Sequence, residues 1–503
     1  MKKFILTNLL ILLFFSVTVQ AQEIPEATLS AVKEIYTCSL SKTKVKLSWD
    51  AVEGADSYLL FRKNTNSTKY QQLAELTKCS YTDKTIKYNK SYTYRIVPVT
   101  ALVTLPDTEE ATDSTETSNS EETTTTDSLE NTAPSELPDT PEVSILPETP
   151  TVSETLTTTE TPTTEAPATP EPSPVPEQTT TYIYGPETTK TFSNQKIVAS
   201  DHQKYSYTEM KKDISQLIDK YHGLVSAEEI GKSADGRILY DVILGNPDAE
   251  KTILVVSALH AREYMTSLLS MSQIEYYLEQ YNNKIDGTKV ANVLEEICIH
   301  YLPMANPDGV TISQYGISKI ESASLQKKLK KLTKNSTATW KANARGVDLN
   351  RNFPYDFKVR GKVGSAGYSG ASANSEKETS ALTALIKTLK KETSLQGVIN
   401  YHAMGSIIFG NYDTTIKKSV AKDIDKMYRL ARELTGYSSA AGYYKGNSSG
   451  SNGNLREYLM YDLKIPSITI EIGRKACPLP ISEFSSIWLK NKNLVIQEAA
   501  LFL

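Results

Sequence analysis

Alternating hydrophobic and polar positions mark the first folded part of the chain. Residues 45–49 alternate with period two, and residues 57–62 and 91–97 are short runs rich in apolar and aromatic side chains. Turn-forming residues, such as Glu-Gly-Ala-Asp at 53–56, separate these segments. Short strands joined by turns are typical of antiparallel sandwiches. The pattern therefore predicts a small β-sandwich over residues 28–103.

From residue 203 onward, helical segments alternate with continuous apolar runs. Ser206 and Glu209 have the spacing of a capping box, and apolar residues from Met210 to Tyr221 recur at helical intervals. Residues 252–258 form an uninterrupted apolar run, as in a strand covered on both faces. Further strands are expected at 297–302, 397–401 and 467–472. This alternation predicts an α/β domain over residues 203–503, with a mixed, mostly parallel twisted sheet flanked by helices.

A segment without hydrophobic periodicity separates the two parts. Residues 104–185 are built largely from Thr, Glu, Pro and Ser, and no Lys or Arg occurs between Val97 and Thr189. The interval holds 19 acidic residues, so the rest of the chain carries a net charge of +15 although the whole chain carries −4. Such a composition buries too little apolar area to offset chain entropy. We therefore predict a disordered acidic linker that acts as an extended spacer.

The N-terminus has the features of a secretory signal peptide. Lys2 and Lys3 precede an apolar stretch at residues 4–19, and small residues allow cleavage after Ala21. No internal apolar run reaches the roughly 18 residues that a membrane helix needs. The mature protein is therefore expected to be secreted and extracellular, without a transmembrane segment. Association with a cell wall is left open.

Candidate metal ligands stand at the ends of two of the expected strands. His260 and Glu263 follow the first long apolar strand and are three positions apart, so a helix or turn there would bring both side chains to one side. His402 ends another strand and would project at the same edge of the sheet. Two imidazoles and a carboxylate can hold zinc and leave one position open for water. Of the other histidines, His202 and His222 are expected at the surface and His300 in a structural role.

Several motifs resemble the M14 zinc carboxypeptidases, the carboxypeptidase A family, over nearly all of residues 203–503. Their order and spacing fit throughout, so the match is specific. The shared stretches are IGKSADGR (230–237), HARE (260–263), NPDGV (306–310), GVDLNRNFP (346–354), INYHAMG (399–405) and TIEIG (469–473). The resemblance implies the zinc carboxypeptidase fold and one Zn²⁺ per catalytic domain, held by His260, Glu263 and His402.

The resemblance also implies a catalytic group around the metal. By position, Glu471 matches the glutamate that takes a proton from the attacking water and passes it to the leaving amine. Lys341 stands where the family has an arginine that supports the developing oxyanion, and Arg345 is close by, so that role is open between the two. Arg262 matches another arginine that contacts the substrate.

Four further residues are implied in substrate binding. Asn350 and Arg351 match the pair that holds a terminal carboxylate, a task that suits a guanidinium group. Tyr444, or its neighbour Tyr443, would be the family's mobile tyrosine. Arg456 falls where the family sets its side-chain preference, which would favour an acidic terminal residue or diaminopimelate over bulky apolar ones. The alternative is that Arg456 pairs with an acidic residue at the surface.

The N-terminal part resembles a fibronectin type III domain over about 75 residues. The strings LSWDAVEGADSYLLFRK and SYTYRIVPV carry the likeness, with Trp49 as core aromatic and Tyr92 as candidate corner tyrosine. Such a module has no chemistry of its own, and both a spacer and an adhesin role are open. Four cysteines are too few for a disulfide-dense scaffold. Cys38 and Cys79 lie in this module, and an exported protein allows a disulfide between them.

These features favour a secreted zinc metallocarboxypeptidase that hydrolyses the C-terminal peptide bond of peptides. The main alternative is a peptidase of peptidoglycan stem peptides that cuts γ-D-glutamyl–diaminopimelate bonds, because residues 340–350 also resemble such relatives. A net charge of about +9 on residues 190–503 would suit an anionic wall surface. A non-catalytic wall- or glycan-binding protein is a remote alternative, disfavoured by the intact ligands and Glu471. No nucleic-acid partner is expected.

Overall fold

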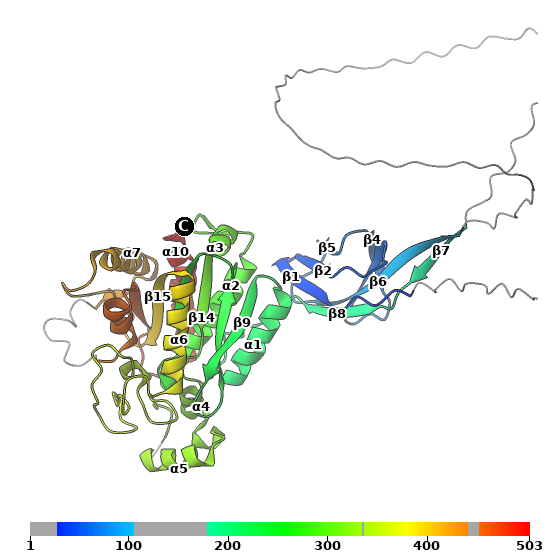
Figure 1. Ribbon diagram of the computed structural model, residues 1–503. Coiled ribbons are helices and arrows are strands. Elements are labelled where there is room, and N and C mark those ends of the chain that lie inside the picture. The colour runs from blue at the N-terminus through cyan, green and yellow to red at the C-terminus, as the bar shows by residue number, and fades with distance from the viewer. Residues whose placement is uncertain (1–27, 105–178, 334–335, 441–451) are drawn as a thin grey trace, which may run out of the picture. The chain divides into compact units, whose positions relative to one another are not determined.

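The computed structural model describes residues 28–104, 179–333, 336–440 and 452–503 (Figure 1). The predicted signal peptide, residues 1–21, lies outside the described residues. The same is true of most of the predicted linker and of Tyr443 and Tyr444. Across the described ranges, no helix is both long and apolar enough to cross a membrane.

The described residues before residue 194 form two small β-sheets. Their strands are β1 Ile35–Ser41, β2 Lys44–Trp49, β3 Ser57–Asn64, β4 Gln71–Leu76, β5 Ser80–Asp83, β6 Ser91–Thr104, β7 Thr179–Tyr184 and β8 Thr188–Ser193. One sheet has the order β1-β2-β5 and the other β4-β3-β6-β7, with β8 also paired to β6. Both sheets contribute to one core, in which Trp49 meets Tyr58 edge to face with ring centroids 5.5 Å apart. The strands predicted in this part are confirmed as β2, β3 and the first half of β6.

The C-terminal end of the predicted linker forms a strand instead of lacking structure. β7 lies inside residues 104–185 and pairs with the long strand β6. Its sequence, Thr-Thr-Thr-Tyr-Ile-Tyr, contains only β-branched and aromatic residues, which favour strands. The prediction of no secondary structure is therefore wrong for these residues, and strands from both sides of the linker complete one sheet.

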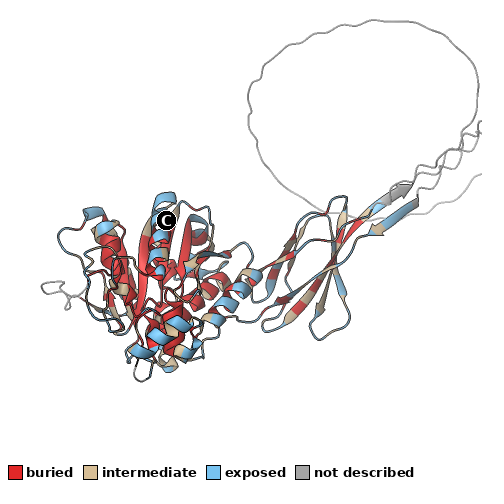
Figure 2. Cartoon of the chain, turned by 60° about the horizontal axis from the view of Figure 1, so that its bottom comes forward, coloured by how far each residue is buried: buried red, intermediate tan, exposed pale blue. Residues whose placement is uncertain are grey.

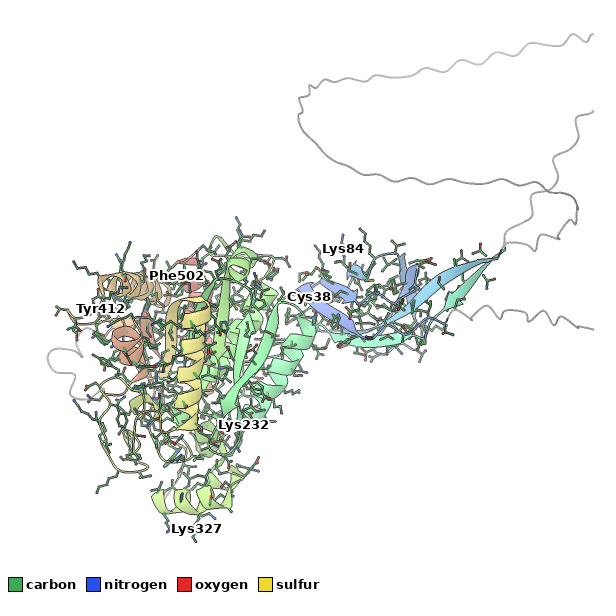
Figure 3. All side chains as sticks on the ribbon, in the orientation of Figure 1. Cys38, Lys84, Lys232, Lys327, Tyr412 and Phe502 are labelled. Carbon is green, nitrogen blue, oxygen red and sulfur yellow. The ribbon has the colours of Figure 1, made fainter. Side chains whose placement is uncertain are left out.

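Cys38 and Cys79 are separate free thiols. The register of β1 and β2 places Cys38, labelled in Figure 3, opposite Lys46. The backbone carbonyl of Cys79 instead accepts a hydrogen bond of 3.1 Å from the amide of Trp49, which lies opposite Ile35. The two cysteines therefore lie at different positions along the sheet. The disulfide between Cys38 and Cys79, which the sequence allowed, is not formed.

The α/β part is built on a mixed sheet. Its strands are β9 Val225–Lys232, β10 Ile238–Leu244, β11 Lys251–Val256, β14 Ile297–Leu302, β15 Ser394–Ala403, β16 Ile407–Phe409, β17 Ser438–Ser439 and β18 Ser467–Ile472, in the order β17-β16-β18-β15-β11-β14-β10-β9. The central strands β14, β11, β15 and β18 run parallel. β10 and β16 join them as antiparallel neighbours. A separate small ribbon pairs β12 Lys284–Ile285 with β13 Thr288–Lys289. The predicted α/β architecture is confirmed.

Helices cover both faces of this sheet, and the buried residues concentrate between the layers (Figures 1 and 2). The helices are α1 Tyr207–Lys220, α2 Met265–Glu279, α3 Val290–Glu296, α4 Pro307–Tyr315, α5 Ala323–Leu332, α6 Lys377–Glu392, α7 Lys418–Thr435, α8 Leu455–Glu457, α9 Phe484–Asn491 and α10 Leu494–Ala500. Shorter turns are η1 Ala261–Glu263, η2 Ile317–Lys319, η3 Leu349–Arg351, η6 Ile481–Glu483 and the π-helical turn η5 Tyr458–Asp462. One core joins α1, α2, α3, α7, α9 and α10 to the sheet, and a second core joins α6 and α8 to its opposite face.

The predicted entry helix is confirmed as α1. Ser206 is its N-cap, and its Oγ accepts from the Glu209 amide at 3.1 Å while the Glu209 carboxylate accepts from the Ser206 amide at 2.8 Å. The reciprocal bonds satisfy amides that a helix start leaves unpaired. The buried residues Met210, Ile214 and Leu217 face the core at helical spacing, as predicted.

Candidate active site

His260 and Glu263 lie just past the C-terminal end of β11. The strand ends at Val256, and the backbone turns at Ala258, whose φ is 50°. His260 is the N-cap of the short turn η1, in which Glu263 is the last residue. Both side chains are buried, and His260 Nδ1 lies 2.9 Å from Glu263 Oε1. The spacing of three residues therefore brings both groups to one side, as the sequence predicted.

His402 reaches the same place from the next strand. β15 runs parallel to β11, so both strands end at one edge of the sheet. His402 Nδ1 lies 3.0 Å from His260 Nδ1 and 2.8 Å from Glu263 Oε2. The Ala403 amide also donates to Glu263 Oε2 at 3.2 Å, which fixes the carboxylate.

These three side chains form a donor set that fits zinc. Their ligand-type atoms all lie within 4.8 Å of one another, and all three residues are buried. Two imidazole nitrogens and a carboxylate oxygen match the ligands of His₂Glu catalytic zinc sites. A buried convergence of acceptor atoms is costly without a cation, so the arrangement suits a bound metal ion better than a structural role.

Asp348 holds His260 from the side opposite the donor cluster. Its Oδ1 lies 3.1 Å from His260 Nε2, while its Oδ2 lies 3.1 Å from Lys341 Nζ and accepts from the Gly367 amide at 3.1 Å. Burial raises the pKa of Asp348, but the charges of His260 and Lys341 outweigh this and hold it well below the usual range. A carboxylate here favours the imidazole tautomer that carries its proton on Nε2, which leaves Nδ1 free to bind a metal.

Glu471 lies on β18 directly opposite His402 on β15. Burial raises the pKa of Glu471 to about 7; Glu263 adds to the rise, while His402 and Lys341 act against it. A carboxyl group that titrates near neutral pH is suited to exchange protons during a reaction. The sequence predicted Glu471 on a strand near the expected metal ligands, and the register places it opposite one of them, His402.

A cavity of about 150 Å³ opens beside the donor cluster. Nine residues line it: Asn350, Arg351, Asn400, His402, Phe409, Asn454, Arg456, Thr469 and Glu471. The structure thus brings together five residues that the sequence selected from distant motifs: Asn350, Arg351, His402, Arg456 and Glu471. Arg351 Nη1 donates to the Asn350 carbonyl at 2.6 Å, and its buried Nε has no hydrogen-bond partner in the described part of the chain.

Arg456 is buried in α8, with 5% of its surface exposed. Its Nη1 donates to the Asn411 carbonyl at 2.7 Å and lies 3.7 Å from Met460 Sδ. Arg456 therefore does not lie at the surface, where the alternative placed its ion pair. Its guanidinium group contributes positive charge to the wall of this cavity.

The other basic residues predicted for the site do not all lie in it. Lys341 contacts Asp348 within the site, whereas Arg345 lies 3.5 Å from Glu376 and lines a separate cavity. Arg262 is adjacent to Glu263, and its Nε is buried without a partner among the described residues. Lys341 is thus the better placed of the two candidates for the oxyanion.

The histidines outside the donor cluster lie where the sequence suggested. His202 and His222 are exposed, and His300 is buried on β14 with Nδ1 2.7 Å from Asp241 Oδ2.

Comparison with known proteins assigns the family. The family model described as zinc carboxypeptidase, of the M14 peptidases, matches residues 210–494. The chain belongs to the M14 zinc carboxypeptidases. Enzymes of this family are zinc hydrolases, and the donor cluster offers the site for the ion.

Individual relatives are more distant. The chain is 27% identical over 295 residues to γ-D-glutamyl-L-diamino acid endopeptidase 1 of Lysinibacillus sphaericus, covering 57% of this chain and 70% of that protein. It is 26% identical over 257 residues to mast cell carboxypeptidase A of Rattus norvegicus, covering 49% of this chain and 58% of that protein. The solved structure of thrombin-activatable fibrinolysis inhibitor matches with a TM-score of 0.48 at 19% identity, covering 61% of this chain and 76% of that one.

Two residues of this zinc carboxypeptidase were missed by reasoning from the sequence. Asp348 lies inside the motif GVDLNRNFP. Because it lies in a loop, no hydrophobic periodicity in the sequence indicates its contact with His260. Asn400 stands two residues before His402 in INYHAMG, and only its alternation along β15 places it on the same face.

Proposed function

We propose that this chain is a zinc-dependent carboxypeptidase that removes the last residue of peptides with a free terminal carboxylate. The observation that carries the proposal is that Glu471, His402, Asn350 and Arg351 line one small cavity. If Asn350 and Arg351 hold the terminal carboxylate, the last peptide bond of the substrate lies near Glu471, because all three residues line the same cavity.

Glu471 is the proposed general base and acid. His260, Glu263 and His402 would hold the zinc ion, which supplies a water of lowered pKa and polarises a carbonyl group. Glu471 takes the proton from the attacking water and passes it to the leaving amine. Its raised pKa suits both directions of this transfer.

Lys341 is the proposed support for the developing oxyanion, together with Arg262. Lys341 carries a positive charge into the site while it is held by Asp348 at 3.1 Å. Lysine supplies charge without the planar fork of arginine, so its stabilisation is less directional.

The terminal residue is proposed to enter the cavity with its main-chain carboxylate on Asn350 and Arg351. Arg456 would then face its side chain, and its positive charge in the cavity wall favours acidic side chains over apolar ones. Tyr444 lies outside the described residues, and its part in substrate binding stays a prediction.

Peptidoglycan stem peptides are the second candidate substrate. A relative named as a γ-D-glutamyl-L-diamino acid endopeptidase covers more than half of this chain and favours this reading. We propose that secretion after cleavage at Ala21 and association with a cell wall bring the enzyme to such a substrate. The β-sandwich is proposed as a fibronectin type III-like spacer.

Product analysis tests the proposal and separates the candidates. The zinc-loaded enzyme is incubated with a mixed peptide pool and with muropeptides, and the products are identified by mass spectrometry. Loss of single C-terminal residues supports the carboxypeptidase, and cleavage only of γ-D-glutamyl bonds supports the second candidate. Internal cleavage of ordinary peptides, or no cleavage in either pool, would overturn both.

A further inference from the structure

The helix α5 buries only part of its apolar face. Leu325, Leu329 and Leu332 recur at helical spacing, but of all the residues of α5 only Leu329 is buried. The helix lies at the margin of the α/β part, where Lys327 is labelled in Figure 3 (Figures 1 and 3). Leu325 and Leu332 line a groove of about 690 Å³ beside the helix, which we call the α5 groove.

The α5 groove has an apolar lining. Ala344, Val347 and Val363 contribute to it together with the two leucines of the helix. Val363 is an exposed apolar side chain, with 46% of its surface accessible. The groove shares no described residue with the cavity beside the donor cluster, so the two are separate. A hollow of this size that combines apolar side chains with a few charged groups is typical of ligand sites.

Positive charge accompanies this apolar lining. Lys328, Lys331, Arg345 and Lys377 line the groove and are exposed, whereas Glu376 is the one carboxylate among the described lining residues. Glu376 is buried and already lies 3.5 Å from Arg345 Nε. The three lysines pair with no carboxylate in the described ranges. The groove therefore has an excess of cations that face solvent.

The combination of cations and apolar side chains favours one kind of partner. A phosphate polymer or an acidic glycan would pair with the lysines but would leave the leucine and valine side chains in contact with water. A bilayer surface is flat and would not fill a groove. A peptide that carries acidic and apolar residues meets both needs, because its carboxylates pair with the cations while its apolar side chains leave water.

We propose that the α5 groove binds a peptide segment of a partner protein that is rich in acidic and apolar residues. The carboxylates of the segment pair with Lys328 and Lys331, and its apolar side chains cover Leu325, Leu332 and Val363. This site is independent of the proposed function, because it uses none of the residues assigned to zinc binding, proton transfer or recognition of a chain end.

A synthetic peptide tests the proposal on the full chain. The probe is a fluorescent octapeptide of alternating glutamate and leucine, acetylated and amidated, and its binding is followed by anisotropy. The terminal amide removes the free carboxylate that the catalytic cavity is proposed to recognise. Binding should weaken as salt rises, because exposed charges are screened. Probes with lysine in place of glutamate, or serine in place of leucine, should bind at least about tenfold more weakly.

Two pairs of lysines on α5 provide a matched comparison. Changing Lys328 and Lys331 together to glutamate should weaken binding of the probe by about tenfold or more. The same double change at Lys327 and Lys330 alters the net charge equally on the same helix, but neither of these exposed residues lines the groove. This control should bind the probe within about threefold of the wild type. Glutamine replaces glutamate in the first pair if that variant melts early.

Two valines of one loop provide the apolar comparison. Val363→Ser should weaken binding by about threefold or more, because the probe then loses an apolar contact in the groove. Val359→Ser changes a valine that is even more exposed, at 67%, but does not line the groove. Its affinity should equal that of the wild type.

The outcomes decide between the possible occupants of the groove. Equal weakening by both lysine pairs, or no binding up to about 1 mM probe, would overturn the proposal. Tighter binding of polyphosphate or of anionic lipid vesicles than of the probe, lost in the Lys328 and Lys331 double variant, would assign the groove to that partner instead and would also overturn it. The same holds for a dimer of the chain that Val363→Ser dissociates.

Discussion

His402 and Glu471 lie directly opposite each other on the neighbouring parallel strands β15 and β18. A proposed metal ligand and the proposed base are thus positioned by the hydrogen bonds of the sheet rather than by mobile loops. Sites built on strands hold their geometry more closely than sites on loops. The same ladder places Asn400 opposite Thr469, and both residues line the cavity that also contains His402 and Glu471.

Glu471→Gln should keep the fold and the zinc ion but lose turnover. The amide is of similar size but cannot accept the proton of water, and loss of a general acid–base group typically costs about 10²–10⁴-fold in rate. Rates are measured alongside the metal-to-protein ratio. Glu433→Gln, an exposed change on α7, is the control. A near-normal rate, or loss of zinc in Glu471→Gln, would argue against the assigned role.

Asp348→Asn should weaken zinc binding without removing a ligand. The amide no longer favours the His260 tautomer that frees Nδ1, and changes to such supporting groups typically cost about 10–100-fold in metal affinity. Competition with a chelator measures the affinity. His402→Ala, which removes a ligand itself, should cost more. Unchanged affinity in Asp348→Asn would show that the contact with His260 is incidental to the metal.

The sequence predicts the donor cluster because of a simple topological rule. His260 and His402 each follow a buried strand, and parallel strands of one sheet end at a common edge. The choice between Lys341 and Arg345 depends on local backbone shape. Arg345 precedes Gly346, whose positive φ of 79° turns the chain, and it lies beside Glu376 instead. A turn of this kind leaves no hydrophobic pattern by which to predict it.

Arg456→Leu should reverse the preference for the terminal side chain. In the wild type, peptides that end in Glu should be cleaved faster than those that end in Leu, because the guanidinium group in the cavity wall attracts a carboxylate. The variant should favour Leu, by about tenfold or more. Arg432→Leu on the exposed face of α7 should leave the preference unchanged. Faster wild-type cleavage of terminal Phe or Leu than of Glu would sink this assignment.

His300 should make stability depend on pH in the alkaline range. Burial lowers its pKa, but the hydrogen bonds and charges of Asp241 and Cys298 raise it to about 10. A raised folded-state pKa adds stability that is complete below the unfolded value of about 6.5 and is lost as pH rises toward 10.

His300→Gln tests this dependence by thermal melting between pH 6 and pH 10. Removing one partner of a buried pair costs about 3–5 kcal/mol, so the variant should melt well below the wild type at pH 6. The difference in melting temperature between the variant and the wild type should decrease steadily toward pH 10. His202→Gln changes an exposed histidine and should show no such trend. A gap that stays constant over the range would mean that His300 is not charged in the folded protein.

Dependence on a free terminal carboxylate tests the central claim most directly. Two peptides with the same sequence ending in glutamate, one with a free carboxylate and one with a terminal amide, are incubated with the zinc-loaded enzyme and followed by mass spectrometry. The geometry of Asn350, Arg351 and Glu471 around one cavity predicts release of the last residue from the free peptide at a rate at least about a hundredfold above the amide. Equal cleavage of the two peptides, or cleavage at an internal bond, would contradict a carboxypeptidase.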